Sequence, residues 1–243
     1  MDVFTWLILI VAALITSIIS GFLGMAGGIS LLSVMTAVLP APMVVPLHGV
    51  VQLASNATRT AVYIPHVRWK IFGIFIGPLV IGMLCATAVW SGDKLTLFKP
   101  GIGIFVLTFL AYRRRGPKAR NLPMWTYAPL GVVTGFLSIF VGATGPFLAP
   151  FFLREDLKKE EIIATKAVCQ AATHLMKLPA FLSLGFDYQP HLPLLGGLIL
   201  AVVIGTSVGR MLLGKISQQS FLRLFELVLA VIALYLIASP FLR

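Results

Sequence analysis

Charged residues are scarce in this sequence. Only 11% of its 243 residues are Asp, Glu, Lys or Arg, whereas a soluble globular domain typically holds about 25%. Cysteine is scarcer still, because the chain has only Cys85 and Cys169, and both lie in apolar segments. The low charge excludes an ordinary water-soluble domain, and the two isolated cysteines give no indication of a disulfide framework.

Hydrophobic residues make up 58% of the chain and recur in runs of about 18 or more, the length that crosses a bilayer as an α-helix. Eight apolar segments can be recognised: Val3–Leu39, Val44–Ile64, Ile71–Trp90, Leu95–Tyr112, Trp125–Leu153, Ile162–Leu184, Leu192–Leu213 and Phe221–Phe241. The longest polar interruption, residues 113–124, leaves no room for a soluble domain. The sequence therefore predicts an all-α integral membrane protein with one domain, residues 1–243, that crosses the inner (plasma) membrane several times.

The first and the fifth segment contain clusters of glycine. They read GFLGMAGGIS over residues 21–30 and GFLSIFVGATGP over residues 135–146. Glycine leaves helical geometry at low cost, and proline stops a helix from continuing. We expect a broken helix in each segment, with the second interrupted from Gly135 onward. For the first cluster, close helix packing is the alternative role of the glycines.

The two halves of the chain share a pattern. Residues 21–23 and 135–137 are both Gly-Phe-Leu, an offset of 114. In the segments that follow, polar residues align at an offset of 118, pairing His48, Gln52, Ser55, Asn56 and Arg59 with Lys166, Gln170, Thr173, His174 and Lys177. This register indicates an internal duplication, with residues 1–112 and 121–243 as two repeats, each a glycine-broken hairpin of re-entrant type plus three spans.

The basic residues outside the aligned positions predict how the repeats are oriented. If all eight segments crossed the membrane, eight Lys and Arg would lie on each side, against the cytoplasmic excess that membrane proteins show. If the fifth segment enters and returns on one side, the division becomes thirteen to three. Trp125 to Gly135 would then form an arm of about ten residues, half a bilayer. In this arrangement the repeats are inverted, the basic 113–120 loop is cytoplasmic, and six or seven segments span fully.

The aligned polar residues form a stripe on one face of each helix. Their spacing is i, i+4, i+7 or i+8, and i+11 in both segments. Because the two segments run in opposite directions, we expect the stripes to pair crosswise. His48 and Lys177 would lie toward the periplasm, Arg59 and Lys166 toward the cytoplasm, and the amide and hydroxyl side chains between them.

Every charge on the stripes is positive, and no carboxylate accompanies them. A Lys or Arg at the centre of a transmembrane helix costs roughly 2.5–3.5 kcal/mol, which an anionic ligand would offset. Amide and hydroxyl side chains can donate to an oxyanion, and helix N-termini at the glycine breaks favour anions. Histidine has an unperturbed pKa near working pH, so His48 and His174 are candidates for proton coupling. The candidate substrate-binding side chains are Gln52, Asn56, Arg59, Gln170, His174 and Lys177.

Each of these residues also has an interpretation without a ligand. Arg59 and Lys166 can snorkel to the cytoplasmic headgroups, whereas Lys177 lies further from an interface and should matter more for anion binding. Polar residues often join helices by hydrogen bonds, and His174 can be a satisfied core histidine. Ser138 with His174 would suit an intramembrane hydrolase, but Ser138 has no obvious oxyanion arrangement. The conjunction of stripe, repeat and charge sign favours an anion site.

The glycine-broken opening, the His-Gln-Asn-Arg stripe after Pro46 and their degenerate copy in the second half resemble the TauE/SafE sulfite exporter family of the toluene-sulfonate uptake permease group. The resemblance covers essentially the whole chain. It implies a membrane transporter of a small sulfur-containing anion such as sulfite, a sulfonate or sulfoacetate, exported by some members and imported by others. By motif position it points to Gly24, Gly27, Gly28, Gly142 and Gly145 in the hairpins, and to Gln52, Asn56, Gln170 and His174 as ligand contacts. Met25-Ala26 and GATGP depart from the fuller glycine runs of the family.

Together these features predict a secondary transporter that works by alternating access, with the anion held between the hairpins and the two polar helices. An anion channel of the same architecture is the alternative. We expect no enzymatic activity, no metal and no cofactor. The expected partners are the small anion, membrane lipid and, as an option, a second copy in a homodimer. Nucleic acid is not expected, because the net charge of +11 is explained by cytoplasmic loops.

Overall fold

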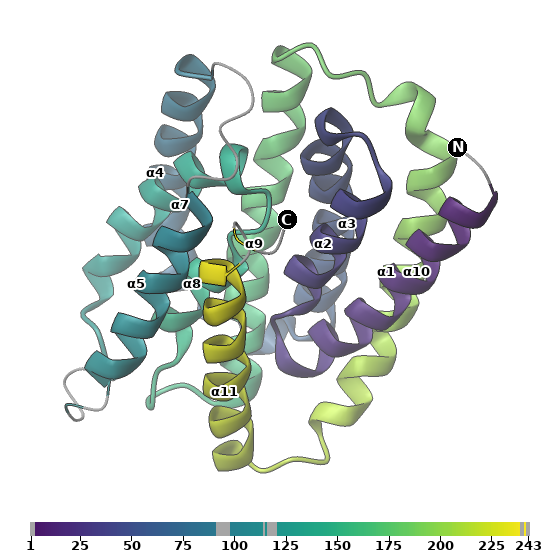
Figure 1. Cartoon of the computed structure of the whole chain (residues 1–243). Coiled ribbons are helices and arrows are strands. Elements are labelled where there is room, and N and C mark those ends of the chain that lie inside the picture. Colours follow the sequence, from purple (N-terminus) through teal and green to yellow (C-terminus); the bar gives the residue numbers. More distant parts are fainter. Residues whose placement is uncertain (1–2, 91–97, 114, 116–120, 239–240, 242–243) are drawn as a thin grey trace.

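The computed structural model describes residues 3–90, 98–113, 115, 121–238 and 241, and these ranges contain helices and no strand. Their α-helices (Figure 1) are α1 (Val3–Leu23), α2 (Gly27–Val38), α3 (Ala41–Val62), α4 (Trp69–Ala88), α5 (Phe98–Arg113), α7 (Tyr127–Val141), α8 (Gly145–Phe152), α9 (Lys159–Ser183), α10 (Leu192–Leu213) and α11 (Gln218–Ala238). Short 3₁₀ turns precede α4, α7 and α10, at Ile64–His66, Met124–Thr126 and Gln189–His191. The all-α prediction is confirmed.

Five of the described helices are long and apolar enough to cross a membrane: α1, α4, α10, α11, and α7 together with its preceding turn. Helices α3 and α9, with 22 and 25 residues, are as long but more polar. Helix α5 has 16 residues, about 24 Å of helix, and the start of the predicted segment Leu95–Tyr112 lies outside the described residues. The protein is a multi-pass membrane protein, and the number of full spans stays a prediction.

The first glycine cluster both packs and breaks the helix. Gly24 and Ala26, between α1 and α2, have φ angles of +71° and +74°, so the chain leaves helical geometry there. Gly21 lies inside α1, where a Cβ would be 2.6 Å from the Thr206 carbonyl oxygen of α10. Gly21 therefore serves close helix packing, and the break begins at Gly24.

The second cluster divides these roles in the same way, and the predicted break at Gly135 is wrong. Helix α7 continues through Gly135, and the break comes at Gly142, with a φ of +75°. A Cβ on Gly135 would lie 2.2 Å from the Leu79 carbonyl oxygen, so this glycine lets α4 and α7 approach closely. The first arm has 15 residues, about 22 Å of helix, which is longer than the expected half-bilayer arm.

The second hairpin begins and ends at the same end of the molecule. Glu155, after α8, donates its backbone N–H to Asn121 Oδ1, before α7, at 3.1 Å. Arg154 donates to the Leu122 carbonyl oxygen and pairs with Asp156 at 2.8 Å. Hydrogen bonding from the Arg154 guanidinium lowers the pKa of the Asp156 carboxyl. These contacts hold together the residues before α7 and those after α8, which we call the two feet of the hairpin.

Helices of the first half of the chain pack along helices of the second half, an exchange between the halves: α1 packs along α10, and α4 along α7. In both pairs the helices run in the same direction, because the close contacts ascend together: Ile10–Gly197 then Gly21–Gly209, and Phe75–Gly131 then Met83–Gly135. Helix α5 packs against α11, and α3 against α9. Inverted repeats produce this kind of exchange, although the duplication itself stays a prediction.

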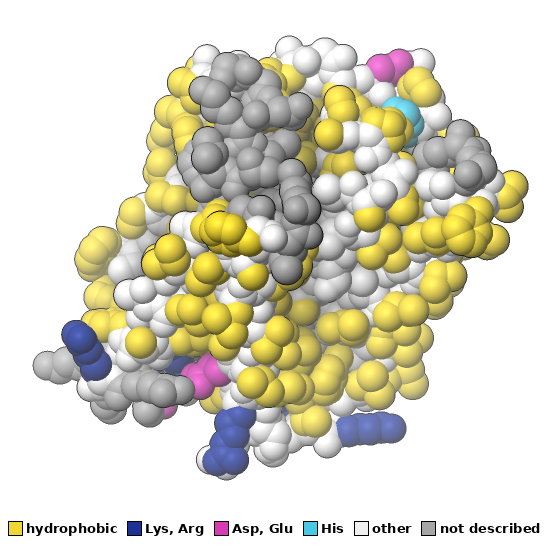
Figure 2. Space-filling view, in the orientation of Figure 1, with side chains coloured by type: hydrophobic (Ala, Val, Ile, Leu, Met, Phe, Trp, Pro, Cys, Tyr) yellow, Lys and Arg dark blue, Asp and Glu magenta, His cyan; other side chains and the backbone are white. Residues whose placement is uncertain are grey.

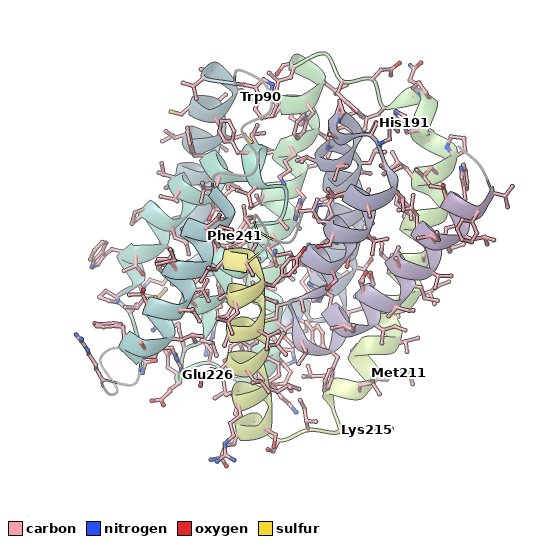
Figure 3. All side chains as sticks on the ribbon, in the orientation of Figure 1. Trp90, His191, Met211, Lys215, Glu226 and Phe241 are labelled. Atoms are coloured by element: carbon pink, nitrogen blue, oxygen red, sulfur yellow. The ribbon has the colours of Figure 1, made fainter. Side chains whose placement is uncertain are left out.

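Basic side chains gather at one end of the molecule. Figure 2 shows Lys and Arg at the lower end of the view, and Figure 3 places Lys215 there and Trp90 at the opposite end. An ion pair of 2.9 Å between Arg68 and Glu161 joins the loop before α4 to the first turn of α9 at this end. We name it the basic end, where α3, α5 and α10 finish and α4, α7, α9 and α11 begin, and we name the opposite end the far end.

Candidate functional site

Helices α3 and α9 pack against each other inside the molecule and carry the two polar stripes. Helix α9 begins with two glutamates in its first turn, and the Lys158 N–H donates to Glu161 Oε2 at 2.9 Å, which satisfies the helix start. All the stripe residues are buried, with 7% relative exposure or less: His48, Gln52, Ser55, Asn56, Arg59, Lys166, Gln170, Thr173, His174 and Lys177. The stripes therefore face protein and not lipid.

The stripes pair crosswise. Near the far end, Lys177 lies beside the start of the α3 stripe, since a Cβ on Gly49 would be 3.5 Å from Lys177 Cδ. Toward the basic end, Arg59 and Lys166 line the same cavity. Cations thus lie at both ends of the paired stripes, with the amides between them.

A cavity of about 20 Å³ lies between the stripes and the two hairpin breaks. Its lining comes from the first half, Ser20, Gly24, Met25, Ala26, Gly28, Ile29, His48, Gln52, Asn56 and Arg59, and from the second, Ala143, Gly145, Pro146, Lys166, Gln170 and His174. No Asp or Glu lines the cavity, and none of the described buried side chains is acidic. The volume suits roughly one water molecule, so a polyatomic anion requires the walls to move apart.

Arg59 and Lys166 turn inward, so the snorkelling interpretation is wrong for both. Arg59 Nη1 donates to Asn56 Oδ1 at 2.9 Å and Nη2 to a serine hydroxyl at 3.2 Å, while its buried Nε has no described partner. Lys166 Nζ donates to the Gly24 carbonyl oxygen at 2.9 Å and to Gln170 Oε1 at 2.8 Å. Every described acceptor of these two cations is neutral.

Lys177 is fully buried and donates Nζ to the Gly142 carbonyl oxygen at 2.5 Å. Unlike the other predicted binding residues, Lys177, Gly27 and Gly142 do not line the cavity. A Cβ on Gly27 would lie 2.0 Å from the Thr16 carbonyl oxygen, so Gly27 lets the two arms of the first hairpin approach closely. Gly142 makes the second break.

Two histidines meet on the side of the cavity nearer the far end. The rings of His48 and His174 are 6.0 Å apart, edge to face. His48 Nε2 lies 2.8 Å from the Gly28 carbonyl oxygen and donates to it in the tautomer protonated at Nε2. Nδ1 of both rings is buried without a hydrogen-bond partner among the described residues. Each ring therefore has a nitrogen that can bind a ligand or exchange a proton.

Each break places a glycine of a helix start beside a glutamine. A Cβ on Gly28, in the first turn of α2, would lie 3.1 Å from Gln52 Oε1, and one on Gly145, at the start of α8, would lie 3.0 Å from Gln170 Nε2. The first N–H groups of a helix have no intrahelical acceptor. Both sides of the cavity thus combine a helix N-terminus with a neutral amide.

Residues between and beside the break glycines also line the cavity, although the stripe pattern did not indicate them: Ser20, Met25, Ala26, Ile29, Ala143 and Pro146. Thr144, in the second break, has a buried Oγ1 with no described partner. The signal that could have found these residues is their position inside the glycine clusters or, for Ser20, directly before the first cluster.

Ser138 lies apart from this cavity. Its Oγ donates to the Gly135 carbonyl oxygen of its own helix at 2.8 Å, and it does not line the cavity that His174 lines. The structure therefore does not assemble the Ser138–His174 pair that a hydrolase would need.

Comparison with known families decides the broader class. The model of the sulfite exporter TauE/SafE family matches residues 9–236, nearly the whole chain. The chain belongs to this family. Comparison with curated proteins and with solved structures gave no match. The family match spans both hairpins and both polar helices, so the cavity lies within the part of the chain that defines a TauE/SafE protein.

Proposed function

We propose that this TauE/SafE protein is a secondary transporter that moves a small sulfur oxyanion across the inner membrane by alternating access. The observation that carries the proposal is the set of three buried cations, Arg59, Lys166 and Lys177, on two helices without a buried carboxylate. The cavity between these helices and the hairpin breaks is the proposed binding site.

Electrostatics favours an anion over a neutral ligand here. Lys166 and Arg59 are bonded only to carbonyl, amide and hydroxyl oxygens among the described residues. An anion about 4 Å from one of these cations gains roughly 4 kcal/mol at an effective dielectric constant of 20. A neutral hydrogen bond contributes a net of about 1 kcal/mol. The site therefore selects charge before it selects shape.

The remaining contacts suit an oxyanion. We propose that the side chains of Gln52, Asn56, Gln170 and His174 donate to the oxygens of the substrate, together with the first N–H groups of α2 and α8. The glycines beside the glutamines keep these N–H groups accessible, because any side chain there would occupy the space of the glutamine amides.

The small volume of the cavity supports a carrier over the alternative channel. A channel needs a continuous aqueous path, whereas these 20 Å³ lie between the contacts that Lys166 and Lys177 make with the two breaks. Substrate entry requires the walls to separate on one side, which is the central step of alternating access. We propose that the basic end is cytoplasmic, because membrane proteins concentrate Lys and Arg on that side.

Proteoliposomes provide the test. Sulfite, sulfate, thiosulfate, taurine, sulfoacetate and carboxylate analogues are offered in turn, and uptake and counterflow are measured. We expect saturable uptake of at least one sulfur oxyanion, stimulated by the same anion on the opposite side. Uptake of carboxylates alone would refute the sulfur substrate, and unsaturable flux without stimulation would identify a channel.

Proton coupling is a further part of the proposal. His48 and His174 border the cavity and have unpartnered Nδ1 atoms, so protons can follow the anion through them. His48→Gln or His174→Gln should transport without dependence on a pH gradient. Unchanged dependence in both variants would remove the histidines from the coupling mechanism.

A further inference from the structure

Two of the lysines of α9, Lys166 and Lys177, each bind the carbonyl oxygen of a hairpin break. Lys166 Nζ donates to Gly24 at 2.9 Å, and Lys177 Nζ donates to Gly142 at 2.5 Å. Each glycine directly follows the last residue of the preceding arm and has a positive φ. Helix ends leave carbonyl oxygens without intrahelical donors, so the two ammonium groups cap the ends of α1 and α7.

The two contacts lie at different depths. Lys166 and Lys177 are eleven residues apart on α9, about 16 Å along its axis, or half of a hydrocarbon core of about 30 Å. Helix α9 starts at the basic end, so Lys166 is nearer that end and Lys177 nearer the far end. Helix α1 runs parallel to α10 toward the basic end, and α7 runs parallel to α4 toward the far end. Each hairpin therefore reaches past the cavity to its lysine.

Apolar side chains complete the closure at each lysine. A Cβ on Gly24 would lie 2.9 Å from Cγ1 of Ile163, which is buried on α9 one turn closer to the basic end than the lysine. A Cβ on Gly142 would lie 3.2 Å from Leu32 Cδ1 and 3.4 Å from Val45 Cγ2, on α2 and α3. The cavity lies between these two apolar contacts.

We propose that the two lysines are side-specific gates carried by one helix, an inference that rests on the transporter function proposed above. The contact between Lys166 and Gly24 closes the path to the basic end, and the contact between Lys177 and Gly142 closes the path to the far end. Transport releases one contact while the other holds. Both contacts are formed in this structure, which accounts for a cavity too small for a polyatomic anion.

The substrate reaches the two gates by different routes. Lys166 Nζ also donates to Gln170 Oε1, which lines the cavity, so an anion beside Gln170 competes directly with the Gly24 carbonyl oxygen for the ammonium group. Lys177 lies outside the cavity wall, and His174, three residues before it on α9, lines the cavity. Substrate or proton binding at His174 is therefore the step that reaches the far gate.

Side-specific thiol labelling tests the gates without any substrate. The background carries Cys85→Ser and Cys169→Ser, and the reporter is Ser20→Cys or, separately, Ala143→Cys, because both positions line the cavity and are buried. Right-side-out and inside-out vesicles present the far end and the basic end in turn to a membrane-impermeant maleimide. The labelling rate from each side is measured.

The gate proposal predicts that two matched variants are labelled faster from opposite sides of the membrane. Lys166→Met should raise labelling from the basic end by about tenfold and leave the far end unchanged, and Lys177→Met should do the reverse, since each loses the charge-assisted hydrogen bond to its hairpin break. Lys70→Met, an exposed lysine at the basic end, should change neither rate. Equal acceleration from both sides, or no acceleration, would overturn the proposal.

A second pair of variants covers poor folding of the lysine variants. Ile163→Ala and Leu32→Ala open the apolar part of each gate and should give the same two polarities, with monodispersity checked by size-exclusion chromatography. Because labelling needs no substrate, the two proposals can fail separately. If no anion is taken up but each variant is still labelled faster from its expected side, the transport proposal is refuted and the gate proposal stands. If anion is taken up but labelling is equally fast from both sides in every variant, the gate proposal alone is refuted.

Discussion

Replacing Arg59 by glutamine should weaken anion binding without destabilising the protein. Arg59 is 1% exposed, lines the cavity and uses both Nη atoms on neutral acceptors, while its Nε has no described partner. Glutamine keeps an amide donor but loses the charge and the reach of the guanidinium. The change therefore separates the charge of this position from its polarity.

The structure sets the expected size of the effect. A hydrogen bond to a charged group contributes about 1.5–3 kcal/mol, so loss of one such contact should weaken affinity roughly 10- to 100-fold. In the absence of anion, the variant loses two hydrogen bonds from a charged donor, about 1.5–3 kcal/mol each, and regains about 1 kcal/mol for each one that the glutamine amide makes. It is also relieved of a buried cation that costs roughly 2.5–3.5 kcal/mol. The unfolding temperature should accordingly stay unchanged or rise.

Isothermal titration calorimetry in detergent measures the affinity, with the anion identified by the uptake screen, and a thermal shift assay measures stability. Lys70→Gln is the matched control, because Lys70 is exposed at the basic end and its replacement removes the same charge far from the cavity. Screening by salt should limit the effect of that control to about twofold.

A fall in unfolding temperature with unchanged affinity would refute this reasoning. It would mean that Arg59 joins turns of α3 through Asn56 and the serine hydroxyl, as polar residues often do in membrane helices. Equal loss of affinity in Lys70→Gln would also refute it, because the effect would then be one of overall charge.

Three further predictions concern the hairpins and the lysines. Gly24→Ala should lower the unfolding free energy by about 1–2 kcal/mol from its positive φ alone, with an added clash against an isoleucine of α9, whereas Gly73→Ala, which meets open space, should not; equal stability of the two variants would contradict this. Arg113→Met loses contacts to a glutamate of α11 and to a carbonyl oxygen after α8, so thermal unfolding should come earlier while calorimetry finds affinity within about twofold; a large loss of affinity would show that the foot of the hairpin acts on the site. Lys166→Gln should weaken binding more than Lys177→Gln, because Lys166 lines the cavity and Lys177 does not. The reverse order in the same assay would contradict this and favour the expectation from the sequence, in which Lys177 matters more because it lies further from the headgroups.

The polar stripes could be located from the sequence because the spacing of their residues puts all of them on one face of a helix. Gln52 and Gln170 recur at the spacing of a helical face inside apolar helices, so their burial followed from the pattern. The inward orientation of Arg59 and Lys166 did not follow, because long side chains can equally reach the headgroups. Their acceptors include the Gly24 carbonyl oxygen of a hairpin break, and a sequence does not show how far such a break reaches.

The position of the second break was mispredicted because glycine serves two purposes that look identical in sequence. Gly21 and Gly135 both begin a Gly-Phe-Leu, and both lie inside a helix against a carbonyl oxygen of a neighbouring helix. The breaks themselves start at Gly24 and Gly142, which are 118 residues apart, the same offset as the stripes. A single offset for hairpin and stripe would have found them, whereas the identical tripeptides favoured 114.

The neutrality of the lysine acceptors has a consequence for turnover. If Lys166 and Lys177 were paired with carboxylates, an incoming anion would have to displace a full charge and would gain little. Carbonyl oxygens instead satisfy the geometry of each ammonium group through hydrogen bonds of about 1.5–3 kcal/mol and leave its charge uncompensated. An anion at about 4 Å gains roughly 4 kcal/mol at an effective dielectric constant of 20, a margin of about 1–2.5 kcal/mol over the carbonyl. For Lys166, which lines the cavity, that margin opens the gate when substrate arrives, and it is small enough for the Gly24 carbonyl to recover the lysine when the substrate leaves.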